Sequence, residues 1–209
     1  MSRRQGKKAE ETRRNILAAA EELFMTRGYD AVTMREIAKQ AGCSHTAIYI
    51  YFREKETLLL ELSLPLLRAL RKQVNAIMEQ EEPPHEQLIT LCLSIIRFGL
   101  TYRNMYPFIF TVKSLSVDDE NQSVQEINDI RVQLFSKFEQ AIQSSLELEE
   151  HDNRLLTNVD ILSCTLHGII VTYSVPKEGA DEQINKLTPL FQEACEVLLA
   201  GFRWRISQT

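Results

Sequence analysis

Two helix starts, eleven residues apart, are the feature of this sequence that most restricts its fold. Thr33 is followed three residues later by Glu36, the spacing of a capping box in which each residue binds the other's backbone N–H. Ser44 is a second N-cap residue, and Gly42 before it suits the left-handed turn that ends a helix. Because only Cys43 separates Gly42 from Ser44, the pattern predicts two short helices joined by a very tight turn.

A longer apolar pattern precedes this pair. Apolar residues recur at helical spacing over 12–27, and Gly28 then ends this first predicted helix. On the third helix, Ile48 and Phe52 lie four residues apart and are expected to pack on the first two helices. The outward face is then formed by His45, Thr46, Tyr49 and Ile50. Three helices in this order form a helix-turn-helix arrangement.

The stretch "IYIYF", residues 48–52, allows two interpretations. An amphipathic helix usually packs its aromatic side chains inward. Alternatively, Tyr49 and Tyr51 lie along a DNA backbone and donate hydrogen bonds to phosphate oxygens, and Lys55 adds a charge-assisted contact. Tyr49 cannot share a face with Ile48 and Phe52, which favours the second interpretation.

The net charge changes sign along the chain. The whole chain has a net charge of −5. Residues 1–58 carry 11 lysines and arginines against 8 acidic residues, a net charge of +3, whereas the remainder carries 13 against 21, a net charge of −8. A basic N-terminal part on an acidic body fits a polyanionic partner that only the N-terminal part touches.

The composition favours an all-helical protein. Only 7 glycines and 6 prolines occur in 209 residues, and no segment alternates apolar and polar residues as an exposed strand does. We expect residues 1–54 to form the helix-turn-helix domain and residues 55–209 a larger helical body. Pro65 should kink the helix that joins the two. The further predicted helices span 55–80, 86–103, 107–114, 123–148, 153–173 and 181–204.

Several classes of protein find no support in the sequence. No apolar run approaches the roughly 18 residues that span a bilayer, and no signal peptide is visible, so we expect a cytoplasmic protein without a membrane partner. The cysteines are scattered, which indicates neither disulfides nor zinc; they are Cys43, Cys92, Cys164 and Cys195. A phosphate-binding loop, a nucleophile elbow and metal-ligand spacing are missing, so we expect no enzyme, cofactor or metal. A protein-interaction module would explain a helical bundle but not the N-terminal pattern.

The segment 28–58, "GYDAVTMREIAKQAGCSHTAIYIYFREKETL", resembles the N-terminal signature of the tetracycline-repressor (TetR) family of bacterial transcriptional regulators. Matching positions run from Thr12 to Leu58, about a quarter of the chain. Cys43 and Thr46 depart from the valine and glycine that are common at those positions. The stretch "LSCTLHGIIV" is similar to a His-Gly element of some TetR C-terminal domains. The resemblance implies a DNA-binding regulator, more often a repressor than an activator, that binds a pseudo-palindromic operator as a homodimer.

The resemblance also implies which residues contact double-stranded DNA. They are Thr33, Arg35, Ser44, His45, Thr46, Ala47, Tyr49, Tyr51 and Lys55. Arginine is the usual bidentate reader of guanine, which suits Arg35, although a solvated surface role is the alternative for Arg35 and Thr46. Thr33 either contacts phosphate, caps its helix or does both. The N-terminal arm with Arg3, Arg4, Lys7 and Lys8 either follows the DNA or frays in solvent.

In the body, large aromatic residues and a few side chains that end in hydrogen-bonding groups suit a pocket for a small, largely apolar effector whose binding releases the DNA. The candidates are Phe98, Tyr102, Arg103, Tyr106, Phe108, Arg131, His167 and Tyr173. For each of them, packing in the core is the alternative. His167 stands out because Gly168 beside it permits close approach of another helix.

The last predicted helix carries two apolar stripes, which suggests one face for the core and one for a second copy of the chain. One stripe contains Ile184, Leu187, Phe191, Leu198 and Phe202. The other contains Leu190, Val197 and Gly201. We therefore expect the last two helices to form a homodimer interface as a four-helix bundle.

Overall fold

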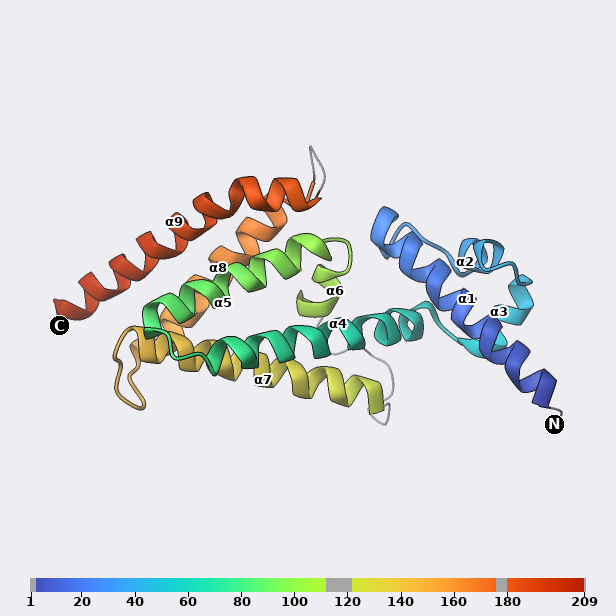
Figure 1. The fold of residues 1–209 in the computed structure, drawn as a ribbon, viewed down its shortest axis with the longest axis horizontal. Helices are drawn as coiled ribbons and strands as arrows, with labels where there is room; N and C mark the ends of the chain where they lie inside the picture. Colours follow the sequence, from blue (N-terminus) through green and yellow to red (C-terminus); the bar gives the residue numbers. More distant parts are fainter. Residues whose placement is uncertain (1–2, 112–121, 176–179, 209) are drawn as a thin grey trace. The chain divides into compact units, whose positions relative to one another are not determined.

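The protein is all-helical over the residues described by the computed structural model, which are 3–111, 122–175 and 180–208 (Figure 1). The helices are α1 (Arg3–Arg27), α2 (Met34–Gln40), α3 (His45–Tyr51), α4 (Lys55–Met78), α5 (Pro84–Thr101), α6 (Tyr106–Thr111), α7 (Gln122–Ser145), α8 (Arg154–Thr172) and α9 (Ala180–Ser207). No strand occurs among these residues, and the predicted all-α class is confirmed. The last residues of the helix predicted over 107–114 fall outside the described residues.

The chain folds as two compact units. The first contains residues 1–67 and 104–128, and the second contains residues 68–103 and 129–209. The start of α4 packs with the N-terminal helices in the first unit: Leu58 and Leu59 are fully buried, and Glu61 forms an ion pair with Arg13 of α1. The functional division into a helix-turn-helix domain of residues 1–54 and a helical body of residues 55–209 stays a prediction.

Helix α1 begins at Arg3, nine residues before the predicted start at Thr12. The Thr12 hydroxyl does not cap a helix but donates to the backbone carbonyl of Lys8 at 2.9 Å, inside the helix. Lysine and glutamate, which make up much of 7–11, are good helix formers, so the helix continues through them. The basic arm is thus helical, with Lys7 and Lys8 exposed.

The core of the first unit joins its three N-terminal helices. Phe24 of α1, Ile37 of α2 and Ile48 of α3 have no exposed surface, and Phe52 has almost none. Asn104, after α5, donates to the carbonyl of Met25 at 2.6 Å and ties that segment to α1. This core holds α2 and α3 in a fixed arrangement.

In the second unit, α5 packs against both α8 and α9. The helices α5 and α8 approach closely at Gly99 of α5, where an added Cβ atom would lie 2.6 Å from Cδ1 of Ile170 in α8. By contrast, a Cβ atom at Gly168 would meet no atom within 4 Å. The close helix approach expected at Gly168 is therefore found, within one protomer, at Gly99 instead.

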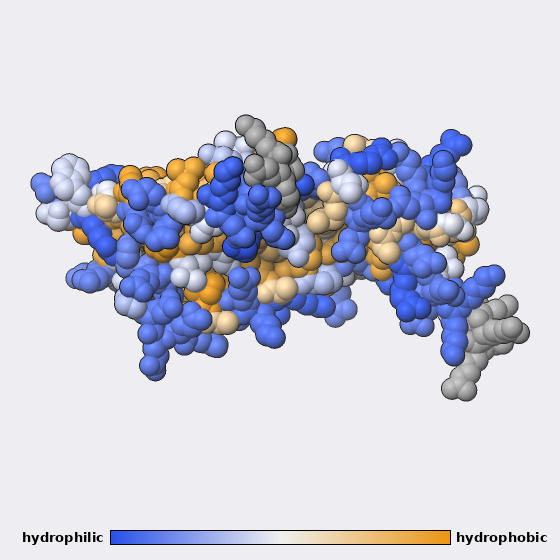
Figure 2. Space-filling view, turned by 45° about the horizontal axis from the view of Figure 1, so that its top comes forward, coloured by the Kyte–Doolittle hydropathy of each residue, from blue (hydrophilic) through white to orange (hydrophobic). Residues whose placement is uncertain are grey.

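Helix α8 is unusually apolar for a helix that the protomer leaves largely uncovered. Among the described helices it is long and apolar enough to cross a membrane by length and composition. This corrects the expectation that no apolar segment approaches the length needed to span a bilayer. Only 28% of its apolar stretch is buried in the protein. One such helix is weak evidence for a membrane span, and α8 also carries Asp160 and Asn158. Leu156 and Val171 are exposed on α8. Figure 2 shows that hydrophobic residues are exposed among hydrophilic ones on one face of the molecule.

Candidate nucleic-acid interface

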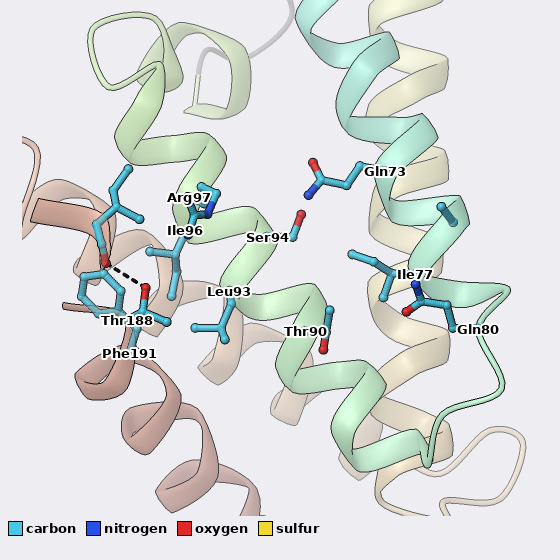
Figure 3. A pocket seen from close by; sticks show the side chains of 12 residues that line it. Gln73, Ile77, Gln80, Thr90, Leu93, Ser94, Ile96, Arg97, Thr188 and Phe191 are labelled. Atoms are coloured by element: carbon cyan, nitrogen blue, oxygen red, sulfur yellow. Dashed lines mark hydrogen bonds between the residues drawn. The ribbon is translucent and has the colours of Figure 1, made fainter. Parts of the chain in front are cut away.

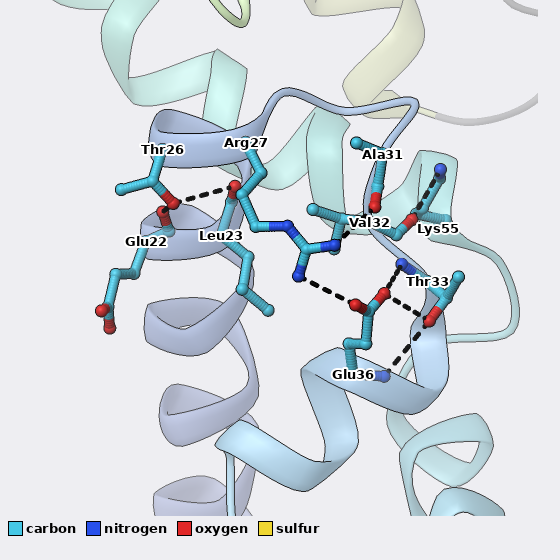
Figure 4. A network of polar contacts seen from close by, with 9 residues as sticks. All are labelled: Glu22, Leu23, Thr26, Arg27, Ala31, Val32, Thr33, Glu36 and Lys55. Carbon is cyan, nitrogen blue, oxygen red and sulfur yellow. Dashed lines mark hydrogen bonds and ion pairs between the residues drawn. The ribbon is translucent and has the colours of Figure 1, made fainter.

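The start of α2 is held by the predicted capping box, which is present (Figure 4). The Thr33 hydroxyl accepts a hydrogen bond from the backbone N–H of Glu36, and the Glu36 carboxylate accepts from the Thr33 N–H at 2.9 Å. Arg27 forms an ion pair with Glu36 at 2.8 Å and donates to the carbonyl of Ala31 at 2.9 Å. The Thr33 hydroxyl, the Thr33 backbone and then Arg27 lower the pKa of Glu36 to about 2.

The turn between α2 and α3 follows the sequence expectation. Gly42 has a φ of +70°, in the left-handed region that glycine adopts without strain. The Ser44 hydroxyl accepts from the backbone N–H of Ala47 at 3.1 Å and caps α3. Ser44 and Thr33 therefore both serve the fold, whatever further contact each makes.

The outward face of α3 is polar and aromatic. His45 and Thr46 are exposed, Tyr49 and Ile50 are 43% and 79% exposed, and Ile48, which precedes them, is buried. The Tyr49 hydroxyl lies 3.5 Å from Nε2 of His45, and the two rings meet edge to face. The face predicted from the sequence is thus present, and this contact orients two of its members. Tyr51 and Ala47 are half-buried at its edge.

Lys55 has a structural role that sequence reasoning missed. Its ammonium donates to the carbonyl oxygens of Tyr29 at 2.8 Å and Val32 at 2.9 Å, and lies 4.0 Å from the centre of the Tyr29 ring. The Tyr29 hydroxyl in turn donates to Glu56 at 2.6 Å; burial and then this bond raise the pKa of Tyr29. An ammonium has three donors, so one is left for a phosphate. Only the three-dimensional path of the loop before α2 reveals these partners.

Arg35, which is expected at the interface, and two further cations that were not among the predicted contacts lie on the surface of the first unit. Arg35 is exposed on α2, one residue before Glu36 of the capping box. Arg53 is exposed just after α3, and Lys39 is exposed near the end of α2. The side chains of Arg3 and Arg4 lie outside the described residues.

The residues expected to bind an effector are distributed over both units. In the second unit, Phe98 is buried with its ring 5.0 Å from that of Tyr102. Arg131 is half-buried, and burial lowers its pKa; Arg103 and His167 are also half-buried. Tyr173 packs its ring 5.5 Å from that of Phe191.

Two members of that set lie elsewhere. Tyr106 belongs to the first unit, where it is buried, and burial raises its pKa to about 12. The side chain of Phe108 lies outside the described residues.

A cavity of about 420 Å³ lies in the second unit between α4, α5 and α9 (Figure 3). None of the expected effector residues whose side chains the structure describes lines it. Its polar lining includes Gln73, Thr90, Ser94 and Arg97. The sequence signal for it was the recurrence of Thr90, Ser94 and Arg97 at helical spacing within the otherwise apolar stretch 88–100.

Comparison with known proteins relates the chain to bacterial regulators. The sequence pattern described as "Bacterial regulatory proteins, tetR family" matches residues 16–62. The uncharacterized HTH-type transcriptional regulator YhgD of Bacillus subtilis is 31% identical over 136 residues, which cover 62% of this chain and 68% of that protein. The HTH-type transcriptional regulator AcrR of Shigella flexneri is 40% identical over 62 residues, which cover 30% of this chain and 29% of that protein.

Solved structures share the fold over most of the chain. The regulator FadR of Bacillus subtilis, crystallised with stearoyl-CoA, has a TM-score of 0.62 and 20% identity, covering 90% of this chain and 97% of that chain. The TetR family regulator PfmR of Thermus thermophilus has a TM-score of 0.63 and 21% identity, covering 88% of this chain and 93% of that chain. At such identities the likeness concerns the fold alone.

A helix-turn-helix with an exposed polar and aromatic face, on a basic N-terminal part, defines a DNA-binding regulator of transcription. The similarity to YhgD and the matched N-terminal pattern show the family of regulators to which the chain belongs. The chain belongs to the TetR family of bacterial transcriptional regulators. The named relatives are regulators rather than enzymes, in agreement with the sequence expectation.

Proposed function

We propose that the protein is a repressor that binds a pseudo-palindromic operator as a homodimer and is released by a small, largely apolar effector. The observation that carries the DNA-binding part is the exposed face of α3, with Tyr49 and Ile50 outward while Ile48 and Phe52 anchor the helix. A regulator that reads the chromosome acts in the cytoplasm, which is where we place it.

The proposed DNA contacts divide into two kinds. Arg35, His45 and Thr46 reach base edges in the major groove or the phosphates beside them, because the recognition helix of a helix-turn-helix enters that groove. Tyr49 and Tyr51 donate to phosphates along the backbone. The complete proposed set is Thr33, Arg35, Ser44, His45, Thr46, Ala47, Tyr49, Tyr51 and Lys55.

We propose that α8 and α9 pair with their copies in a second protomer. On α9, Leu190, Val197 and Trp204 are exposed at spacings that put them on one face. On α8, Gly168 and Val171 share the exposed face, and the helix as a whole is apolar but little buried. A second copy would cover both faces. Sedimentation at micromolar concentration should show a dimer, and a monomer there would refute the proposal.

The effector is proposed to bind in the body near Tyr102, Arg131 and His167, which are partly buried and combine aromatic rings with hydrogen-bonding groups. FadR, which shares the fold, was crystallised with stearoyl-CoA, which supports a small-molecule ligand in this family. Pro65 lies inside α4 and cannot donate the backbone hydrogen bond of a regular helix. Because α4 runs from one unit into the other, we propose that its tilt transmits the signal.

Repression is tested with a reporter gene behind an operator selected from random DNA by the purified protein. We expect the protein to lower expression, and a rise would identify an activator. Thermal-shift screening of metabolites then finds effector candidates, which are retested for release from the operator. A tenfold loss of operator affinity needs about 1.4 kcal/mol of coupling, and operator DNA must weaken effector binding by the same factor. A ligand that binds equally with and without operator would refute the switch.

A further inference from the structure

The cavity between α4, α5 and α9 has the size of a small-molecule site. Its volume of about 420 Å³ falls in the range of roughly 300–1,000 Å³ typical of ligand pockets. Ile77 of α4, Leu93 of α5 and Phe191 of α9 supply apolar surface from its three sides (Figure 3). All of its lining residues belong to the second unit. The cavity is open to solvent, so a ligand can enter without unfolding the bundle.

Ser94 supplies a polar group without a partner. Ser94 lines the cavity and is 7% exposed, and its hydroxyl oxygen makes no hydrogen bond to any residue that the structure describes. Buried hydroxyls without a partner are uncommon in folded proteins. In Figure 3, Ser94 points from α5 toward the side chain of Gln73 on α4. Because Gln73 is exposed, its amide is not held by packing, and its rotation would open the Ser94 hydroxyl to a bound molecule.

The charge of the cavity is that of one arginine. Arg97 lines it, and no aspartate or glutamate is among the described residues that line it. One Arg97 nitrogen, Nη2, donates to Asn185 of α9 at 3.3 Å, a long contact that leaves other N–H groups of the guanidinium for a ligand. A lone cation among amides, hydroxyls and apolar side chains selects for a single negative charge, because a guanidinium binds carboxylates bidentately.

We propose that this cavity binds a small carboxylate with an apolar body. Arg97 pairs with the carboxylate, Ser94 donates a hydrogen bond to it or to a nearby acceptor, and the body of the ligand lies along Ile77, Leu93 and Phe191. The site is separate from the effector site proposed above, since it shares no lining residue with it. It also does not depend on DNA binding.

The test is calorimetric titration of the full-length protein with octanoate and 4-phenylbutyrate, each compared with its primary amide. The amides keep the apolar body and lose the charge. We expect at least one of the two carboxylates to bind at one molecule per protomer and its amide to bind at least tenfold more weakly. Equal affinity of acid and amide, or no binding of either carboxylate at millimolar concentration, would overturn the proposal.

Variants locate the binding. Arg97→Gln removes the charge and should weaken carboxylate binding at least tenfold, and Ser94→Leu should abolish it by filling the cavity. Arg71→Gln is the matched control, because Arg71 is a half-buried arginine of α4 that contacts Gln133 and does not line the cavity. Circular dichroism checks that each variant folds. If Arg97→Gln does not fold, the loss or survival of carboxylate binding in Ser94→Leu tests the location of the site. Carboxylate binding that survives Ser94→Leu, or that Arg71→Gln weakens as much as Arg97→Gln does, would place the ligand elsewhere.

Discussion

The ammonium of Lys55 lies 4.0 Å from the ring centre of Tyr29 and donates to the backbone carbonyl of the same residue at 2.8 Å. A second bond to Val32 makes Lys55 a clamp on the loop that precedes α2. Loss of the clamp leaves two carbonyls without their partner, and hydrogen bonds to charged groups contribute about 1.5–3 kcal/mol. The clamp therefore ties the stability of the first unit to a residue also expected at the DNA.

We expect Lys55→Met to lower the free energy of unfolding by about 1.5–3 kcal/mol. Urea denaturation followed by circular dichroism measures this. Lys39→Met is the control, because Lys39 is exposed on α2 and surface changes usually stay within about 0.5 kcal/mol. Equal stability of the two variants would contradict the clamp.

The stability of the α2 cap should depend on acidity. The folded protein lowers the pKa of Glu36 from 4.5 to about 2 through Thr33 and then Arg27. A carboxylate whose folded pKa is depressed stabilises the fold above its unfolded pKa and loses that effect as the pH falls through the folded pKa. We expect the wild type to have a higher urea midpoint than Glu36→Gln. This difference should be largest above about pH 5 and should vanish toward about pH 2. A difference that stays constant over this window would contradict the cap.

How far the sequence predicts the structure depends on how local each feature is. The Thr33 cap, the Gly42 turn and the burial of Ile48 depend on residues within a few positions, and all three were predicted. The Lys55 clamp joins residues 26 positions apart, and the close contact of Gly99 with Ile170 spans 71 positions. Such contacts arise from tertiary packing and have no local signature. Polar residues at helical spacing hinted at the α4–α5–α9 cavity, but its walls come from three separate helices.

Three glycines distinguish packing within the protomer from the proposed packing between two protomers. A side chain at Gly99 overlaps Ile170, so Gly99→Ala should destabilise the protomer by about 1–3 kcal/mol through overpacking. Gly168 and Gly201 have open space around them within the protomer, so leucine there should leave the helices folded. We expect Gly168→Leu and Gly201→Leu to weaken the dimer at least tenfold in sedimentation experiments. An unchanged dimer in both variants would contradict an α8–α9 interface.

Arg35 should affect DNA recognition differently from the tyrosines. It is exposed on α2, where a bidentate contact to guanine is proposed, and such contacts contribute about 1–3 kcal/mol of discrimination. Arg35→Ala should therefore reduce affinity mainly at one base pair of the operator. Tyr49→Phe, which removes a proposed phosphate donor, should weaken all sequences alike. Fluorescence anisotropy measures the affinity of Arg35→Ala and of Tyr49→Phe for every single-base variant of the operator, so that the two proteins can be compared. Equal losses on matched and scrambled operators for Arg35→Ala would remove Arg35 from base recognition.

We propose above all that the first three helices read a specific DNA sequence. The most direct measurement is the ratio of the dissociation constants for a scrambled duplex and for an operator selected from random DNA, taken by fluorescence anisotropy between 50 and 200 mM salt. We expect the selected operator to bind at least about 10³-fold more tightly, as specific regulators do, with both affinities falling steeply with salt because phosphates are neutralised. Equal affinity for the two duplexes at every salt concentration would contradict the claim.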